Sequence, residues 1–193
     1  MIRTFIALEM NEAQQRHLSN TIQRVARALP SIRWTDPANI HLTLAFLGEL
    51  DDEQLADASD AAETAARSAS AFSYRLSRLG IFGPERQPRV IWMGIDDDSG
   101  ALQRLHAALC LALEQRGFAV DERPFAPHLT LARVKAPLTL EEQHRLHNLL
   151  AGSLPDIVPP AGYLVQHIEL MKSELSRSGA EYTCLQSYLL GQK

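Results

Sequence analysis

The stretch His41-Leu42-Thr43-Leu44-Ala45 occurs a second time, residue for residue, at positions 128–132. The two copies are 87 positions apart (128 minus 41), and chance does not readily produce five identical residues at such a distance. Each copy is typical of a β-strand, in which alternate side chains share a face. His and Thr then lie on one face and the two leucines on the other. The sequence therefore predicts two strands that each present an imidazole beside a hydroxyl.

Helices are predicted on both sides of each copy. Three helix starts show a polar cap residue followed three positions later by Gln or Glu. These pairs are Asn11 with Gln14, Asp51 with Gln54, and Thr139 with Glu142. The helix that follows the Asp51 cap is predicted to run through Ala71. Ser99 is predicted to cap the remaining helix, and Gly117 to end it.

Short strands are predicted between these helices, so the order helix, short strand, His strand, helix, strand occurs in both halves. They cover residues 32–34, 72–82, 89–95, 162–175 and 181–189, and the second His strand is expected from about Phe125. This repetition indicates an internal duplication. We expect an α+β fold with two antiparallel or mixed sheets, outer helices and a central cleft that carries both His-x-Thr motifs. Residues 1–193 would form a single domain of two pseudo-symmetric lobes sharing one core.

The composition is that of an ordinary globular protein, with 46% hydrophobic and 22% charged residues. No apolar run approaches the roughly 20 residues of a membrane-spanning helix, and residues 1–9 read as a strand and not as a signal peptide. We therefore expect a soluble, cytoplasmic monomer. Cys110 and Cys184 lack a metal-binding spacing and are predicted to be buried free thiols. A net charge of -4 argues against a long basic surface for nucleic acid, so any RNA contact would involve an end or a few nucleotides.

Two imidazoles on one small anion suit the opening of a cyclic phosphodiester. This reaction removes one proton and supplies another on opposite sides of the phosphorus. Because the unperturbed pKa of histidine is about 6.5, one ring can be neutral while the other is protonated, and each proton transfer accelerates the reaction by roughly 10²–10⁴-fold. Threonine hydroxyls can donate to the phosphate oxygens. The predicted chemistry needs no metal, cofactor or covalent intermediate.

Residues 41–48 and 127–133 resemble the paired His-x-Thr-x signatures of the 2H phosphoesterases, in particular of bacterial RNA 2′,3′-cyclic phosphodiesterases, also called 2′-5′ RNA ligases. The opening strand, Arg33-Trp34 and residues 88–92 are similar as well, so the resemblance covers nearly the whole chain. It implies a bilobal fold whose cleft binds RNA 3′ ends or nucleotides that bear a 2′,3′-cyclic phosphate. Hydrolysis to a 2′-phosphomonoester is the implied reaction, and 2′-5′ ligation is its reverse.

The resemblance also implies the roles of the repeated residues. His41 would be the general acid that protonates the departing 3′ oxygen, and His128 the base that activates water. Thr43 and Thr130 would bind the phosphate. Two alternatives stay open: a phosphodiesterase for small nucleotides such as ADP-ribose cyclic phosphate, and a non-catalytic RNA-binding module.

Two further residues are candidates for substrate contact, Arg133 and Trp34. The guanidinium of Arg133 suits a phosphate, although its odd offset from His128 places it on the opposite face unless the strand ends or bulges. Trp34 or Phe46 could stack on a base. Phe46 shares the leucine face by the same alternation and is predicted to lie in the core. His144 and His147 are predicted to be solvated and not metal ligands.

Overall fold

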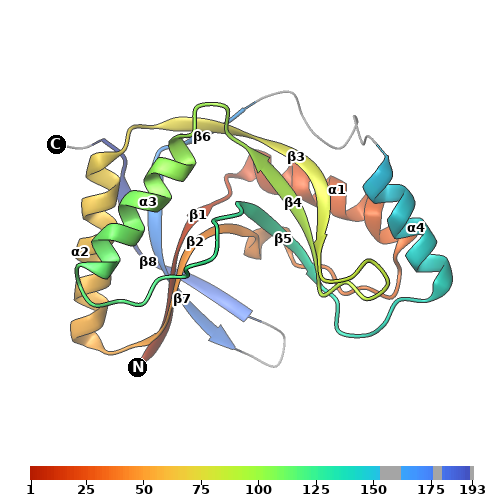
Figure 1. Cartoon of the computed structure of the whole chain (residues 1–193), viewed down its shortest axis with the longest axis horizontal. Helices are drawn as coiled ribbons and strands as arrows, with labels where there is room; N and C mark the ends of the chain where they lie inside the picture. The colour runs from red at the N-terminus through yellow and green to blue at the C-terminus, as the bar shows by residue number, and fades with distance from the viewer. Residues whose placement is uncertain (153–161, 176–179, 192–193) are drawn as a thin grey trace.

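The computed structural model describes residues 1–152, 162–175 and 180–191. Its strands form two four-stranded antiparallel sheets (Figure 1). The first has the order β2 (His41–Leu50), β1 (Ile2–Glu9), β7 (His167–Leu175) and β8 (Ala180–Leu189). The second has the order β5 (His128–Arg133), β4 (Val90–Asp96), β3 (Phe72–Phe82) and β6 (Tyr163–Val165). The two strands that carry the repeat are thus equivalent edge strands of two sheets.

Four helices flank the sheets in two pairs (Figure 1). They are α1 (Glu12–Ala28), α2 (Asp52–Ser68), α3 (Ala101–Glu114) and α4 (Leu140–Ala151). The first pair, α2 and α3, packs beside the first sheet, and the second pair, α1 and α4, lies next to the second sheet. Each pair contains one helix from each half of the chain, as expected for a duplication. The predicted α+β duplication is therefore confirmed.

Three of the four predicted N-cap residues cap their helices in the structure. All three predicted capping boxes are present, at Asn11, Asp51 and Thr139. The prediction for Ser99 is wrong, because the cap of α3 is Gly100, which has a left-handed φ of 66°. The carboxylate of Asp97 takes the main capping role and accepts a hydrogen bond from the Leu102 amide at 2.7 Å.

Some predicted boundaries also differ from the structure. The helix predicted to run through Ala71 ends at Ser68, and the second His strand begins at His128 and not near Phe125. Of the strand predicted at residues 32–34, only Trp34 pairs, in an isolated bridge with Ala132. The segment leading to the first motif therefore lies along the strand that carries the second.

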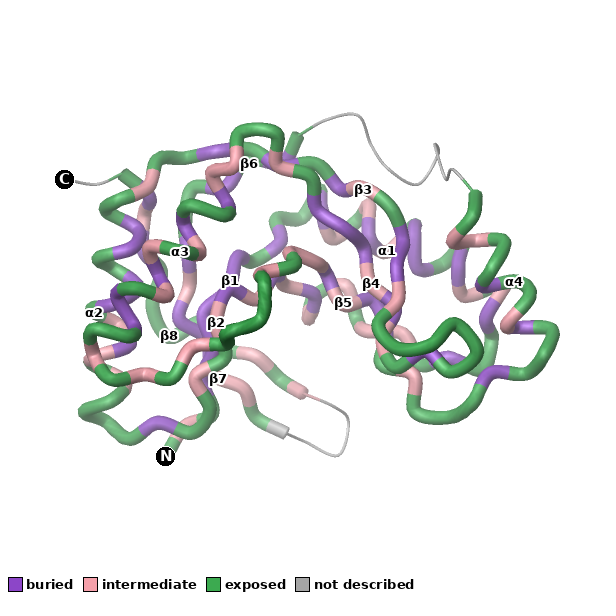
Figure 2. The backbone as a smooth tube through the Cα atoms, in the orientation of Figure 1, coloured by how far each residue is buried: buried purple, intermediate pink, exposed green. Residues whose placement is uncertain are grey.

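The two halves exchange strands. After α2 the chain enters β3, which pairs with β4 in the second sheet, and after β6 it returns through β7 to pair with β1 in the first. Each sheet thus contains strands from both halves. One apolar cluster spans both sheets and all four helices, and in Figure 2 the buried stretches follow the central strands and the inward sides of the helices.

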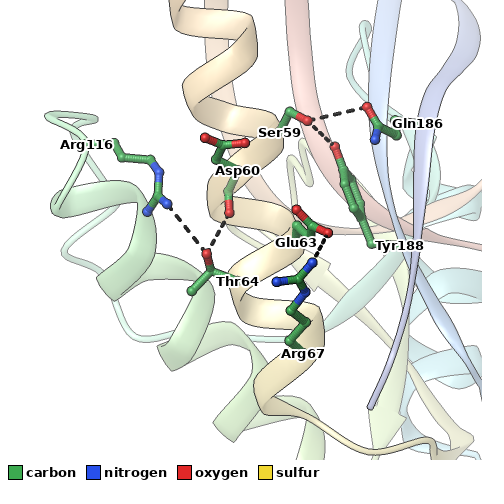
Figure 3. Close-up of polar contacts among 8 residues, drawn as sticks. All are labelled: Ser59, Asp60, Glu63, Thr64, Arg67, Arg116, Gln186 and Tyr188. Atoms are coloured by element: carbon green, nitrogen blue, oxygen red, sulfur yellow. Dashed lines mark hydrogen bonds and ion pairs between the residues drawn. The ribbon is translucent and has the colours of Figure 1, made fainter. Parts of the chain in front are cut away.

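Polar contacts hold α2 between β8 and α3 (Figure 3). The Tyr188 hydroxyl donates to Ser59 Oγ at 2.8 Å, and the Ser59 hydroxyl donates to Gln186 at 3.3 Å. On the other side of the helix, Arg116 donates to Thr64 at 3.5 Å. These contacts hold α2 against one face of the first sheet. The His41 ring contacts Phe5, which belongs to a separate apolar cluster with Ala7 and Met171. Among the described residues, no helix is long and apolar enough to cross a membrane.

Candidate active site

His41 is the first residue of β2, and its ring is anchored by the backbone two residues earlier. Nδ1 lies 3.1 Å from the Asn39 carbonyl oxygen. A carbonyl can only accept, so Nδ1 carries the proton and Nε2 is the nitrogen left for chemistry. His128 repeats this arrangement at the start of β5, with Nδ1 2.8 Å from the Ala126 carbonyl oxygen. The duplication has therefore preserved the tautomer and the orientation of both rings.

The two motifs lie next to each other. The edge strands β2 and β5 are in contact, and the Thr35 amide donates to the Leu131 carbonyl at 2.8 Å. Thr43 and Thr130 are partly buried, two residues after the histidines and on the same strand faces. Two imidazoles and two hydroxyls are thus carried by neighbouring strands.

A β-bulge follows the threonine in each copy. In β2, Thr43 pairs with Ala7 and Ala45 with Ile6, which leaves Leu44 without a partner residue. In β5, Leu131 is skipped in the same way between Thr130 and Ala132. A bulge inserts one residue and so reverses the alternation of faces beyond it. Beyond each bulge, the residues at odd offsets from the histidine therefore lie on the face of the histidine.

This reversal changes the assignment of Arg133 and Phe46. The argument from strand alternation against Arg133 fails, because the bulge restores it to the face of His128 and Thr130. Its side chain is exposed, and its charge acts on His41 in the other sheet. The prediction that Phe46 lies in the core is wrong, since the residue is 65% exposed. Its ring lies 6.0 Å from that of Phe5, which itself contacts His41.

The pKa of His41 is below its ordinary value. Burial is the main cause, and the positive charge of Arg133 acts in the same direction, whereas the hydrogen bond to the Asn39 carbonyl opposes them. Without a bound anion, His41 is therefore predominantly neutral near pH 7. The effect of Arg133 on His41 also joins the two motifs electrostatically.

Aromatic side chains surround both histidines and were not predicted as site residues. His41 contacts Phe5 and Tyr182, with ring centroids 4.6 and 4.8 Å away. His128 contacts Phe82 at 4.8 Å, and Trp92 lies 6.3 Å away. These neighbours come from other strands, so spacing within the motif contains no signal for them.

Within the described residues, Trp34 is not one of the aromatic rings that contact either histidine. It packs against the main core, and its Nε1 is buried without a hydrogen-bond partner among the described residues. Its pairing with Ala132 gives it a structural role at the junction of the two motifs. A contact between Trp34 and substrate stays a prediction.

Two of the other histidines have side-chain partners outside the two motifs. His147 Nδ1 lies 2.6 Å from Glu85, and His106 stacks on Phe125 with the rings 3.8 Å apart. Both cysteines are free, as predicted, but neither is buried, since Cys110 is half-buried and Cys184 is exposed. Within residues 1–152, 162–175 and 180–191, no group of three His, Cys, Asp or Glu side chains is placed to hold a metal ion.

Comparisons with known proteins agree with this fold. Residues 11–177 match the family model of the 2′-5′ RNA ligase superfamily. The chain is 30% identical over 185 residues to the RNA 2′,3′-cyclic phosphodiesterase of Thermotoga maritima, covering 95% of this chain and 93% of that protein. Among solved structures, TT0787 of Thermus thermophilus superposes with a TM-score of 0.82 at 28% identity, covering 98% of both chains.

The structure of Escherichia coli LigT complexed with 3′-AMP is also similar, with a TM-score of 0.71, 26% identity and 99% of both chains covered. The duplicated sheets with paired His-x-Thr strands define the 2H phosphoesterase class. Within this class, the chain belongs to the 2′-5′ RNA ligase superfamily.

Proposed function

We propose that this protein hydrolyses RNA-terminal 2′,3′-cyclic phosphates to 2′-phosphomonoesters. The observation that carries the proposal is the pair of equivalent imidazoles on neighbouring strands, each held through Nδ1 so that Nε2 is left for proton transfer. The relative from Thermotoga maritima, named an RNA 2′,3′-cyclic phosphodiesterase, supports the same activity.

His41 acts as the general acid toward the 3′ oxygen, and His128 acts as the base that takes a proton from water. The threonine hydroxyls of Thr43 and Thr130 donate to the non-bridging phosphate oxygens, where negative charge increases as water attacks. Ring opening then leaves the phosphate on the 2′ oxygen. A 2′-5′ linkage forms when the 5′-hydroxyl of a second RNA replaces water as the nucleophile in this same ring opening, so that His128 takes the proton of the 5′-hydroxyl and His41 again protonates the leaving 3′ oxygen. The cleavage of that linkage back to the cyclic phosphate is the step in which the two histidines exchange roles.

Arg133 binds the phosphate. It lies on the threonine side of β5 because of the bulge, and its exposed guanidinium can donate two parallel hydrogen bonds to an anion. Its positive charge also affects the protonation of His41 before and after substrate binds. Arg133 favours neutral His41 in the empty site, whereas a bound phosphate partly cancels this charge and favours protonation of His41.

Phe46 provides a surface for the base next to the cyclic phosphate. It is 65% exposed on the face of His41, and an exposed aromatic ring can stack on any nucleobase. Trp34 is less suited to this role because it packs against the core. Stacking without base-edge contacts would make the enzyme tolerant of the terminal base.

The net charge of -4 favours short substrates, so a mononucleotide is the second candidate substrate. Turnover of 2′,3′-cyclic AMP should therefore be compared with that of an oligoribonucleotide that carries the same cyclic end. Both reactions should proceed in EDTA and without ATP, and the oligoribonucleotide should have the higher kcat/KM. Chromatography should identify the 2′-phosphate as the product.

Three results would count against the proposal. A 3′-phosphate product would show that the substrate lies the other way between the motifs. Activity lost in EDTA and restored by a divalent ion would exclude the two-histidine mechanism. Tight binding of the cyclic end without any turnover would identify a binding module.

A further inference from the structure

The beginning of β8 touches the first motif at two points. The Asn39 side-chain amide donates to the Ala180 carbonyl at 3.4 Å. Two residues further along β8, the Tyr182 ring meets the His41 ring at a centroid distance of 4.8 Å and an interplanar angle of 82°. These contacts join residues that are about 140 positions apart in the sequence.

The contact with Asn39 matters because the same residue anchors the histidine. The Asn39 carbonyl fixes Nδ1 of His41, while the Asn39 side chain is held by β8. Residues 180–182 therefore contact both the ring and the residue that orients the ring. Two contacts from one strand restrict the position of His41 more than either alone.

Phe5 completes the surroundings of the His41 ring. It lies 4.6 Å from His41 with the rings inclined by 31°, and 5.3 Å from Tyr182 in an edge-on contact. Phe5 belongs to a small apolar cluster with Ala7 and Met171, separate from the main core, and Tyr182 packs against this cluster. The His41 ring is thus enclosed between β1 and β8.

The second motif is held differently. Phe82 and Trp92, the aromatic neighbours of His128, come from β3 and β4, the two strands nearest to β5 in its sheet, whereas Tyr182 comes from β8, at the opposite edge of the sheet that contains His41. The residue that anchors its Nδ1 is Ala126, which has no side-chain amide. Among the described residues, no contact from β8 reaches His128. The two halves are therefore equivalent in their motifs but not in the elements that support them.

We propose that Tyr182 is a positioning residue for His41, and that residues 180–182 fix the direction of His41 Nε2 and exclude water from its ring. This inference rests on the proposed function, in which His41 transfers a proton to the leaving oxygen. A misplacement of about 1 Å can cost up to roughly 10²-fold in rate. Tyr182 therefore acts through His41 and does not take part in the proton transfer itself.

Loss of the Tyr182 ring should also change the titration of His41. Burial is the main cause of its lowered pKa, so opening one side of the ring to water should raise that pKa. Other groups around His41 remain in place in such a variant. They are Phe5 on β1, Glu9, which pairs with His41 from β1, the carbonyl of Asn39, and Arg133 on β5.

The test compares Tyr182→Leu with Tyr182→Phe, and uses Thr183→Ala, at an exposed position of the same strand, as the control. We expect Tyr182→Leu to lower kcat roughly tenfold with little change in KM, and to raise the pKa of His41 measured by NMR of the imidazole. Tyr182→Phe keeps the ring and should behave as the wild type. The signals of His128 should not move in any variant.

Several outcomes would overturn the inference. An unchanged kcat and His41 titration in Tyr182→Leu would show that the contact has no positioning role. An equal loss in Tyr182→Phe would assign the effect to the hydroxyl and not to the ring. A shift of His128 as large as that of His41 would indicate a general structural effect. If the wild type hydrolyses no cyclic phosphate, the proposed function fails, whereas the titration of His41 in the free protein still tests the positioning role.

Discussion

Phe46 and Arg133 occupy the same position in the two halves of the molecule. Each follows its histidine by five residues, and each lies beyond a bulge at a leucine that pairs with no residue on the neighbouring strand. The duplication thus keeps the histidines and threonines identical but places an aromatic ring on one side and a guanidinium on the other. This difference breaks the symmetry of the site and suits an asymmetric substrate with a base and a phosphate.

Replacing either histidine should reduce turnover severely. We expect His41→Ala and His128→Ala each to lower kcat on a 2′,3′-cyclic phosphate by at least roughly 10²-fold, because each removes one proton-transfer group. Circular dichroism should show an intact fold. His144→Ala on α4 is the matched control and should retain full activity. Near-wild-type turnover in either active-site variant would exclude the two-histidine mechanism.

Replacing either threonine should have a milder effect. A hydrogen bond to a charged group contributes about 1.5–3 kcal/mol, so Thr43→Ala and Thr130→Ala should each lower kcat/KM by roughly 10–150-fold. Thr→Ser at the same positions keeps the hydroxyl and should restore most of the activity. Failure of the serine variants to do so would show that the methyl group, and not the hydroxyl, is required.

Arg133→Gln tests whether the bulge at Leu131 places the Arg133 guanidinium where it can bind the phosphate and act on His41. Loss of the guanidinium should lower kcat/KM by roughly 10–150-fold, and it should also raise the pKa of His41 because a nearby positive charge is removed. Steady-state kinetics and NMR titration measure the two effects on one variant. Lys135→Gln, an exposed cation two residues further along, should change neither quantity. An unaltered His41 titration in Arg133→Gln would contradict the closeness of the two motifs.

Phosphate binding should be coupled to proton uptake. Burial and Arg133 lower the pKa of His41 in the free protein, and the charge of a bound phosphate should raise it. Calorimetry of 2′-AMP binding near pH 6.5, in buffers with different ionisation enthalpies, should therefore detect proton uptake. The uptake should disappear in His41→Ala. Release of protons by the wild type on binding 2′-AMP would show that the bound phosphate does not raise the pKa of His41.

The buried carboxylate of Glu142 should make stability depend on pH. Hydrogen bonds from Ser31 and then from Thr139 lower its pKa to about 2, against the effect of burial. Because the folded pKa is below the ordinary value of 4.5, this contribution is present above about pH 4.5 and is lost as the pH falls toward 2. Denaturant titrations of Glu142→Gln should therefore show reduced stability at pH 7 and a smaller decline toward pH 2. Exposed Glu141→Gln should follow the wild type.

Local sequence patterns predicted three of the four helix caps and the placement of His and Thr on one strand face. A capping box such as Asp51 with Gln54 is satisfied by residues three positions apart, so the sequence contains the whole interaction. The same holds for His41 and Thr43, which share a face before any irregularity in the strand. These features depended on neither tertiary contacts nor strand register.

Residues beyond the bulges were not placed correctly from the sequence. Leu44 and Leu131 give no glycine or proline signal of a bulge, and alternation alone then puts Phe46 on the wrong face. The contact of Tyr182 with His41 could not be predicted either, because it joins β2 and β8, the two edge strands of one sheet, which come from distant parts of the chain. The pairing of strands that are distant in the sequence determines both the face of Phe46 and the contact of Tyr182 with His41.

The exchange of strands between the halves has a consequence for synthesis on the ribosome. β1 and β2 are translated before β3 to β6, but β7 and β8, which complete their sheet, are translated only after them. Until then, β1 has an unpaired edge that can associate with other nascent chains. His41 likewise acquires its contact with Tyr182 only after residue 182 has been translated. The surroundings of the first His-x-Thr motif are therefore completed after those of the second, and products truncated before β8 should be inactive even when both His-x-Thr stretches are present.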